Sequence, residues 1–274
     1  MNKSFDLIAK KIIDKKIRCL FISPHLDDAI LSCGGLIFYL NERKVPVTIM
    51  NVFSEGATKP YTLSARVHLY LTNHKSAKDL YRERRKEDKF VLGKLGLKPI
   101  NLGFIEALYR KRKVGRVRLI LGRILPEIIH VYRTYHFGIL SGDISKEKLL
   151  EEKISGKLRT QIGGHKNTLI FCPLGLGVHV DHILVRQACS NNFEKLIYWY
   201  DFPYKDKKAE TENFKNVHRL EKYLFDKNIK EKKGLISGYQ SQTRTLFKKG
   251  IKLNSEKYFV NSKVILNERK QKKT

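Results

Sequence analysis

Two short stretches of the sequence combine histidine and aspartate at spacings that suit chemistry. The first is Ser23-Pro-His-Leu-Asp-Asp28, which lies between an apolar run and the start of a helical pattern. An aspartate at a helix N-terminus commonly serves only as a cap. Capping would explain one of the two carboxylates, but neither the second one nor the histidine two residues ahead of them. His25, Asp27 and Asp28 are therefore candidates for a catalytic or metal-binding role.

The second stretch is Pro173-Leu-Gly-Leu-Gly-Val-His-Val-Asp-His182, and it also follows an apolar run. His179 and His182 are three positions apart, so a single helical turn or a tight loop can direct both imidazoles to one point. A lone histidine is more often structural than functional. A pair with an aspartate between them, at a second strand end, favours a functional site.

Together the two stretches supply the donor atoms of a metal site. His25, one carboxylate of the first stretch and one histidine of the second form the three-ligand pattern of catalytic zinc, which leaves a position for water. A bound divalent ion lowers the pKa of water towards about 7 and polarises a carbonyl, which suits amide hydrolysis. The remaining aspartate would be the general base, and the remaining histidine would face the oxyanion or the leaving amine. Iron or another divalent ion also fits these donors.

The segments around these stretches predict an α/β protein, with a Rossmann-like three-layer fold and a mainly parallel central sheet. Short apolar runs predict strands, and patterns of helical period predict helices between them. We expect strands at 17–23, 45–53, 100–104, 168–172 and 196–202, and helices at 27–40, 76–97, 116–135, 146–160 and 180–193. Ligands of such sheets bind beyond the carboxyl ends of the strands, where both stretches fall.

The chain is expected to have two parts, an α/β core over residues 1–204 and a basic extension over residues 205–274 that packs on this core. The extension holds 20 Lys and Arg against 8 Asp and Glu. It keeps a helical pattern near 231–247 and a strand-like segment at 258–260. Fraying is expected only at 267–274.

The charge of the chain admits several partners. The 274 residues include 55 Lys and Arg against 27 Asp and Glu, a net charge of +28, which suggests nucleic acid, an anionic membrane surface or a merely lysine-rich composition. The densest basic cluster, Arg110-Lys-Arg-Lys113 with Arg116, Arg118 and Arg123, is either a solvated face or a rim that attracts an anionic glycan. No apolar run approaches the roughly 18 residues of a membrane span. Four separated cysteines indicate reduced thiols in a cytoplasmic protein.

With these motifs the sequence resembles the zinc-dependent N-acetyl-sugar deacetylases of the PIG-L (LmbE-like) family. The family signature is a strand followed by Pro-His-x-Asp-Asp and later by His-x-Asp-His, which stand here at 24–28 and 179–182. Further matches are Arg84-x-x-Glu87, Glu106-Ala-Leu-Tyr-Arg110, Tyr200-Asp-Phe-Pro-Tyr204 and Tyr239-Gln-Ser-Gln242. The resemblance covers residues 17–250. Many members carry glutamate after the second aspartate, where this chain has Ala29.

The resemblance implies a role for each motif residue. It implies three zinc ligands, which are His25, Asp28 and His182. Asp27 would be the base that activates the water, and His179 would stabilise the oxyanion or protonate the amine. Arg84 would contact the sugar, although a solvated helix face also explains a cation in that charged segment. Because Ala29 replaces none of these residues, we expect activity to survive.

We therefore predict a cytoplasmic metal-dependent hydrolase that removes the N-acetyl group of a GlcNAc-like amino-sugar derivative, giving acetate and a free amine. Its expected partner is a small N-acetylated glycoside, which is anionic if the basic cluster lines the cleft. One alternative is an amidohydrolase for another N-acyl glycoside, such as a natural product or a lipid-linked sugar. A basic nucleic-acid-binding protein ranks last, because the sequence offers no nucleic-acid motif. The sugar, its aglycone and the oligomeric state, homo-oligomers included, are left open.

Overall fold

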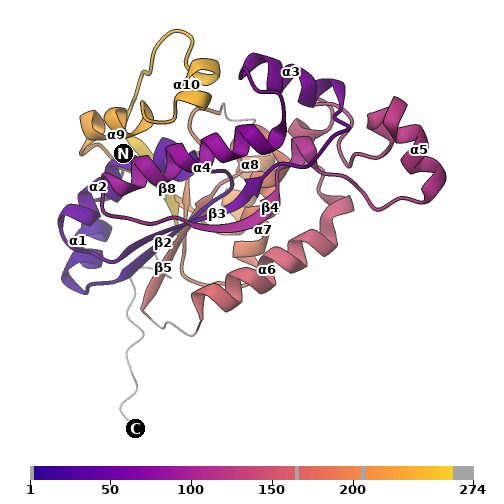
Figure 1. Cartoon of the computed structure of the whole chain (residues 1–274). Coiled ribbons are helices and arrows are strands. Elements are labelled where there is room, and N and C mark those ends of the chain that lie inside the picture. Colours follow the sequence, from indigo (N-terminus) through magenta and orange to yellow (C-terminus); the bar gives the residue numbers. More distant parts are fainter. Residues whose placement is uncertain (1–2, 164–166, 205–207, 262–274) are drawn as a thin grey trace.

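The computed structural model describes residues 3–163, 167–204 and 208–261. Within them, eight strands form one sheet in the order β1-β7-β8-β6-β5-β2-β3-β4 (Figure 1). Neighbouring strands are parallel, except that β8 runs antiparallel to both β6 and β7. The strands are β1 (Lys3–Ser4), β2 (Arg18–Ser23), β3 (Val47–Glu55), β4 (Ile100–Ile105), β5 (Thr168–Pro173), β6 (Leu196–Trp199), β7 (Glu221–Phe225) and β8 (Glu256–Val260).

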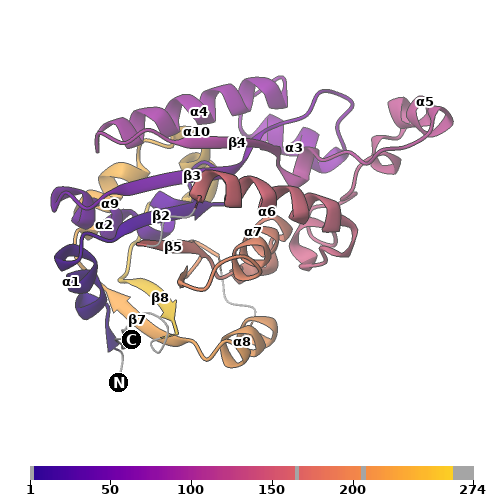
Figure 2. The same cartoon turned by 90° about the horizontal axis from the view of Figure 1, so that it is seen from below.

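Helices cover both faces of this sheet (Figure 2). They are α1 (Asp6–Asp14), α2 (Asp28–Glu42), α3 (Leu63–Leu71), α4 (Ala77–Gly93), α5 (Arg116–Ile124), α6 (Lys148–Ile162), α7 (Val180–Ser190), α8 (Lys208–Val217), α9 (Ile229–Ile236) and α10 (Gln240–Leu246). Single 3₁₀ turns include η1 (Ala107–Tyr109), η2 (Pro126–Ile128) and η5 (Leu176–Val178). The predicted α/β fold with a mainly parallel sheet is confirmed.

The apolar run of β2 shows why the sheet is covered on both sides. Successive side chains of a strand point to opposite faces, and here both faces are apolar. Cys19 and Phe21 pack into the core beneath α1, α2 and α9. Leu20 and Ile22 pack on the other face, beneath α6 and α7. A strand that is buried on both faces reads as a continuous apolar run, which is why β2 and β5 stand out in the sequence.

The chain order reverses between β2 and β5, two neighbouring strands in the interior of the sheet. From β2 the chain continues outward through β3 to β4, and it then crosses back to place β5 on the other side of β2. The loops that leave the carboxyl ends of β2 and β5 therefore diverge around a crevice, which is where open α/β sheets bind ligands. These loops carry the two histidine-aspartate stretches.

Two predicted helical segments are interrupted in the structure. The helix predicted at 116–135 ends at Ile124, because Pro126 has no N–H and disfavours a helical residue before it. The helical segment near 231–247 is split into α9 and α10. Gly238 lies at this break, and a side chain there would meet Val91 of α4 at 2.4 Å. The glycine thus lets the chain pass close to α4.

The C-terminal part of the chain contributes to the same sheet as the rest. β8 lies between β6 and β7, and β7 in turn pairs with β1 at the edge. The division at residue 204 stays a prediction, and the segment at 267–274 lies outside the described residues. Among those residues, no helix combines the length and apolar character that crossing a membrane requires.

Candidate active site

The loop after β2 is held by a serine, which leaves its aspartates available. The Ser23 hydroxyl donates to the carbonyl oxygen of His25 at 2.5 Å and accepts the N–H of Ala29 at 3.0 Å. Asp27 occupies the N-cap position of α2, yet its side chain makes no capping hydrogen bond. The Asp28 carboxylate turns back to accept the N–H of His25 at 2.9 Å. Helix capping therefore does not account for either carboxylate.

Three buried side chains from the two loops converge at the crevice. Oδ2 of Asp28 lies 3.1 Å from Nδ1 of His25 and 3.3 Å from Nε2 of His182. One candidate ligand atom from each of these residues lies within 4.8 Å of the others. Nε2 of His182 is buried and makes no hydrogen bond, so in the neutral ring, whose Nδ1 donates to Asp201, it is available as a ligand atom at this point. The donor set and this orphaned nitrogen fit a divalent cation.

Carboxylates orient both imidazoles from behind. Nε2 of His25 lies 3.1 Å from Oδ2 of Asp181, and Nδ1 of His182 lies 2.7 Å from Oδ1 of Asp201. The other oxygen of Asp201 accepts the N–H groups of Gly175 and Leu176 at 2.8 and 3.0 Å. Such carboxylate-histidine pairs set the tautomer and direction of metal-binding imidazoles.

A second group of possible ligands consists of His25, His179 and Asp181. The Asp181 carboxylate, however, already accepts the N–H of Ala107 at 2.9 Å and pairs with the Arg110 guanidinium. Its oxygens are therefore committed to the protein. The set formed by His25, Asp28 and His182 leaves more donor capacity free.

The site carries strongly shifted pKa values. Burial alone would lower the pKa of His25, but the carboxylate of Glu106 and the two aspartates bonded to the imidazole raise it well above its usual value. Burial alone would likewise raise the pKa of Asp28, yet the His182 and His25 imidazoles hold it well below its usual range. Carboxylates also raise the pKa of His182, to about 9, against the effect of burial. The surrounding carboxylates thus stabilise positive charge at this point.

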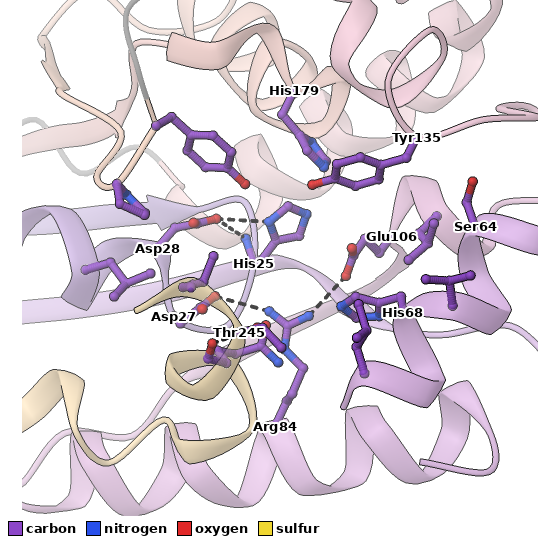
Figure 3. A pocket seen from close by; sticks show the side chains of 18 of the residues that line it. His25, Asp27, Asp28, Ser64, His68, Arg84, Glu106, Tyr135, His179 and Thr245 are labelled. Atoms are coloured by element: carbon purple, nitrogen blue, oxygen red, sulfur yellow. Dashed lines mark hydrogen bonds and ion pairs between the residues drawn. The ribbon is translucent and has the colours of Figure 1, made fainter. Parts of the chain in front are cut away.

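Asp27 belongs to a separate ion-pair chain at the edge of the crevice. The Arg84 guanidinium, from α4, donates to Oδ1 of Asp27 and to Oε2 of Glu106, each at 3.1 Å (Figure 3). Burial raises the pKa of the Asp27 carboxyl, and the Arg84 charge opposes this rise. Burial also raises the pKa of Glu106, to about 7. Asp27 is therefore an oriented carboxylate of increased basicity.

His179 is buried beside His25, with their ring centroids 5.1 Å apart. Its Nδ1 accepts the backbone N–H of Asp181 at 3.2 Å, so the proton of the neutral ring resides on Nε2. Burial and the neighbouring His25 lower the pKa of His179 well below its usual value. His179 is thus a neutral imidazole that can donate a hydrogen bond from Nε2.

These groups open onto a cavity of about 560 Å³. Figure 3 shows Arg84 and Asp27 on one side of it and His179 and Tyr135 on the other. The walls further out are mostly apolar. They include Leu63, Val67, Leu71, Leu108, Pro203, Tyr204 and Leu246. The size suits a small molecule with an apolar portion.

The predicted basic cluster does not form a rim of this cavity. None of the residues at 110–123 lines it. Arg110 is buried and pairs with Glu147 at 2.5 Å as well as with Asp181. Arg110 therefore supports the site from within, and α5 carries Arg116, Arg118 and Arg123, none of which lines the cavity.

Four residues of the site were missed as contributors by the reasoning from sequence. They are Asp181, Asp201, Glu106 and Arg110. Each falls inside a stretch that the resemblance matches, and that position was the only signal available. Their function depends on contacts between segments far apart in the chain, which residue spacing does not reveal.

Comparison with known proteins agrees with the fold and the motifs. The chain matches the family model described as GlcNAc-PI de-N-acetylase (PIG-L) over residues 20–193. This match spans more than half of the chain, so the protein belongs to the PIG-L family. A search of curated proteins returned no significant match.

Several solved structures share the architecture. A deacetylase of teicoplanin biosynthesis, in its bog complex, has a TM-score of 0.69 and 22% identity, with 88% of this chain and 96% of that chain covered. The zinc-inhibited form of teicoplanin deacetylase has a TM-score of 0.66 and 21% identity, with 88% and 97% covered. The A40926 pseudoaglycone deacetylase has a TM-score of 0.63 and 21% identity, with 89% and 97% covered. At these identities the likeness concerns the fold.

Proposed function

We propose that this protein is a metal-dependent hydrolase that removes the N-acetyl group of an amino-sugar derivative and releases acetate. The observation that carries the proposal is the convergence of His25, Asp28 and His182. His25 and Asp28 line the cavity, together with the carboxylate of Asp27. Membership of the PIG-L family supports the same reaction. We expect zinc or another divalent ion at these three ligands.

A bound divalent ion would supply Lewis acidity towards the acetyl carbonyl and would increase the acidity of water. The protein supplies the proton transfers. Asp27, whose pKa is raised by burial, accepts a proton from the attacking water while Arg84 holds its carboxylate in place. The same carboxyl then delivers the proton to the departing nitrogen, which balances the reaction as amide plus water to acetate plus amine.

His179 acts on the other side of the reacting carbonyl. Its neutral ring has the proton on Nε2, so it can donate a hydrogen bond to the developing oxyanion. Such a donor stabilises charge that develops only in the transition state. Both terminal nitrogens of Arg84 are paired with carboxylates. Because Arg84 also lines the cavity, we propose that its side chain contacts the bound sugar.

The cavity favours a substrate with an apolar aglycone. Its single arginine is already paired with Asp27 and Glu106, whereas Leu63, Val67 and Leu246 line the outer wall. An anionic sugar would therefore meet no unpaired Lys or Arg among the described residues of the lining. We therefore expect kcat/KM for acetate release to be higher with an aryl N-acetylglucosaminide than with N-acetylglucosamine 1-phosphate. An N-acyl natural-product glycoside fits the same wall and is the second candidate.

Two substitutions test the proposal. Asp27→Asn should reduce acetate release by about 10³-fold or more, because general-base catalysis is lost, while bound metal stays near one equivalent per chain. His182→Ala should lose both the metal and the activity. His218→Ala removes a histidine outside the cavity and should retain both. Near-normal turnover by the Asp27 variant would exclude this mechanism.

A further inference from the structure

A short helix stands away from the body of the molecule near the cavity. In both views α5 projects beyond the other helices (Figure 1 and Figure 2). Eight of its nine residues are exposed, and the exception is Gly122. A side chain at Gly122 would meet Ile129 at 2.5 Å. Gly122 therefore marks the face of α5 that packs on Ile129. Both residues belong to one arm, residues 111–130, whose two ends are paired through Lys111 and His130.

The opposite face of α5 is apolar and open to solvent. Its side chains follow the i, i+3, i+4, i+7 pattern of one helix face. They are Val117, Ile120, Leu121 and Ile124, with exposed fractions of 72%, 64%, 51% and 86%. At about 100° per residue, the centre of this stripe lies roughly 150° from Gly122 around the helix axis. A contiguous exposed apolar face of this kind marks an interaction site.

Cations border this apolar stripe on both sides. On the helical wheel, Arg116 and Arg123 fall on one flank and Arg118 on the other, and Lys113 precedes the helix. All four are exposed. No acidic residue occurs from residue 107 to residue 126. The arm therefore presents apolar side chains between positive charges.

We propose that α5 docks on an anionic lipid bilayer, with its stripe in the headgroup region and its cations at the lipid phosphates. Amphipathic helices with cations beside an apolar face lie in the plane of such surfaces. Juxtaposed Lys and Arg add electrostatic attraction to anionic lipids. A second copy of this chain suits the stripe less well, because each copy carries a net charge of +28.

The arm is anchored next to the mouth of the cavity. Lys111 donates to two carbonyl oxygens of the segment before α3 at 2.7 and 2.9 Å, and Glu127 accepts the N–H of Leu63 at 2.8 Å. Leu63, Val67 and Leu71 of α3 are exposed and line the mouth. A bilayer beneath α5 would thus lie close to the cavity entrance. The docking itself does not depend on the proposed deacetylation.

Vesicle sedimentation tests this docking directly. We expect the whole protein to bind phosphatidylcholine vesicles that contain about 30 mol% phosphatidylglycerol and to leave pure phosphatidylcholine vesicles unbound. Raising the salt from about 0.1 M to about 0.5 M should weaken this binding. The double variant Arg118→Glu/Arg123→Glu should bind at least about 25-fold more weakly, since each cation contributes about fivefold. The double variant Ile120→Ser/Ile124→Ser should lose about tenfold or more.

Matched controls remove the same groups elsewhere on the surface. Lys148→Glu/Lys153→Glu changes the net charge equally on α6, and Leu7→Ser/Leu149→Ser removes two exposed leucines. Both controls should bind anionic vesicles within about twofold of the wild type. Circular dichroism should show unchanged folding for all four variants. Equal loss in controls and α5 variants, or no binding by the wild type, would overturn the proposal. A dimer that dissociates only in the Ile120/Ile124 variant would assign the stripe to a second copy instead.

Discussion

At the scale of single residues, the site depends on carboxylates that act through histidines. Asp201 illustrates this, because one of its oxygens bonds His182 and the other is held by two backbone N–H groups of the loop after β5. It fixes the direction of Nε2 of His182 without reaching the ligand point itself. Asp181 has the same relation to His25.

We expect Asp201→Asn to weaken metal binding about 10–100-fold, the usual effect of losing an orienting carboxylate. The zinc dissociation constant, measured by competition with a chelating dye, reports this effect separately from turnover. Asp143→Asn, in an exposed loop, should leave the constant unchanged. An unaltered affinity in the Asp201 variant would mean that His182 does not hold the metal.

Asp88 links stability to pH at the residue scale. It is buried on α4, accepts hydrogen bonds from Tyr239 and Asn51, and burial raises its pKa to about 7. Between its unfolded value near 3.9 and about 7, the folded protein therefore holds a proton that the unfolded chain has released. Its contribution to the unfolding free energy falls as pH rises through this window, by up to about 4 kcal/mol.

The variant Asp88→Asn cannot titrate, so it should show a smaller fall in unfolding free energy between pH 4 and pH 7 than the wild type does. Urea denaturation at several pH values measures the difference between the two slopes. Parallel slopes for variant and wild type would show that Asp88 is ionised in the folded protein.

At the scale of elements, the turn between β5 and α7 positions both histidines of the second stretch. The turn requires positive φ at Gly175, Gly177 and Val178. Positive φ is costly for a β-branched residue such as valine, and it marks a segment whose conformation is imposed by its surroundings. At Gly177 a side chain would also meet the Tyr204 ring at 2.9 Å.

Gly177→Ala should therefore lower the unfolding free energy by about 1–3 kcal/mol, because both the backbone and Tyr204 must shift. Acetate release should fall as well, since His179 follows this turn. Gly156→Ala is the matched control. That glycine lies inside α6 with open space around it, so alanine should stabilise the protein by about 0.5–1 kcal/mol. Equal stability of the two variants in urea would contradict the strain argument.

At the scale of the whole molecule, β8 connects the C-terminal part of the chain to α2 in its N-terminal part. Glu256 of β8 is buried, accepts the N–H groups of Gly35 and Leu36 in α2, and pairs with Lys232 of α9 at 2.9 Å. Segments about 220 residues apart thus share one buried network. β8 and α2, the helix that begins at Asp28 of the candidate site, are therefore stabilised by the same contacts.

Glu256→Gln should lower the unfolding free energy by about 3–5 kcal/mol, because it leaves the Lys232 ammonium buried without a counter-ion. Replacing both partners, as in Glu256→Gln/Lys232→Met, should be less damaging than the single change. Chemical denaturation of the three proteins measures this. A single variant as stable as the wild type would show that the ion pair is dispensable.

Much of the fold could be predicted from local patterns. The runs that became β2, β3 and β5 are buried on both sides along most of their length, and such strands are visible in sequence because most of their residues are apolar. α5 and the split between α9 and α10 were less accurately predicted, since a proline and one close approach to Val91 set their ends. The antiparallel insertion of β8 between β6 and β7 is a pairing of distant segments, and no local pattern encodes it.

The sequence by itself determined the donor groups and their order along the chain. Histidine and aspartate spacing within a loop is local, so 24–28 and 179–182 could be recognised without a structure. Only the tertiary structure decided what surrounds them. It showed that Arg110 is buried against Asp181 rather than exposed with its basic neighbours, that Arg84 holds Asp27, and that Asp201 orients His182. Each of these contacts joins residues that meet only when the sheet assembles, because the free energy of burying a charge depends on the partner that folding brings to it.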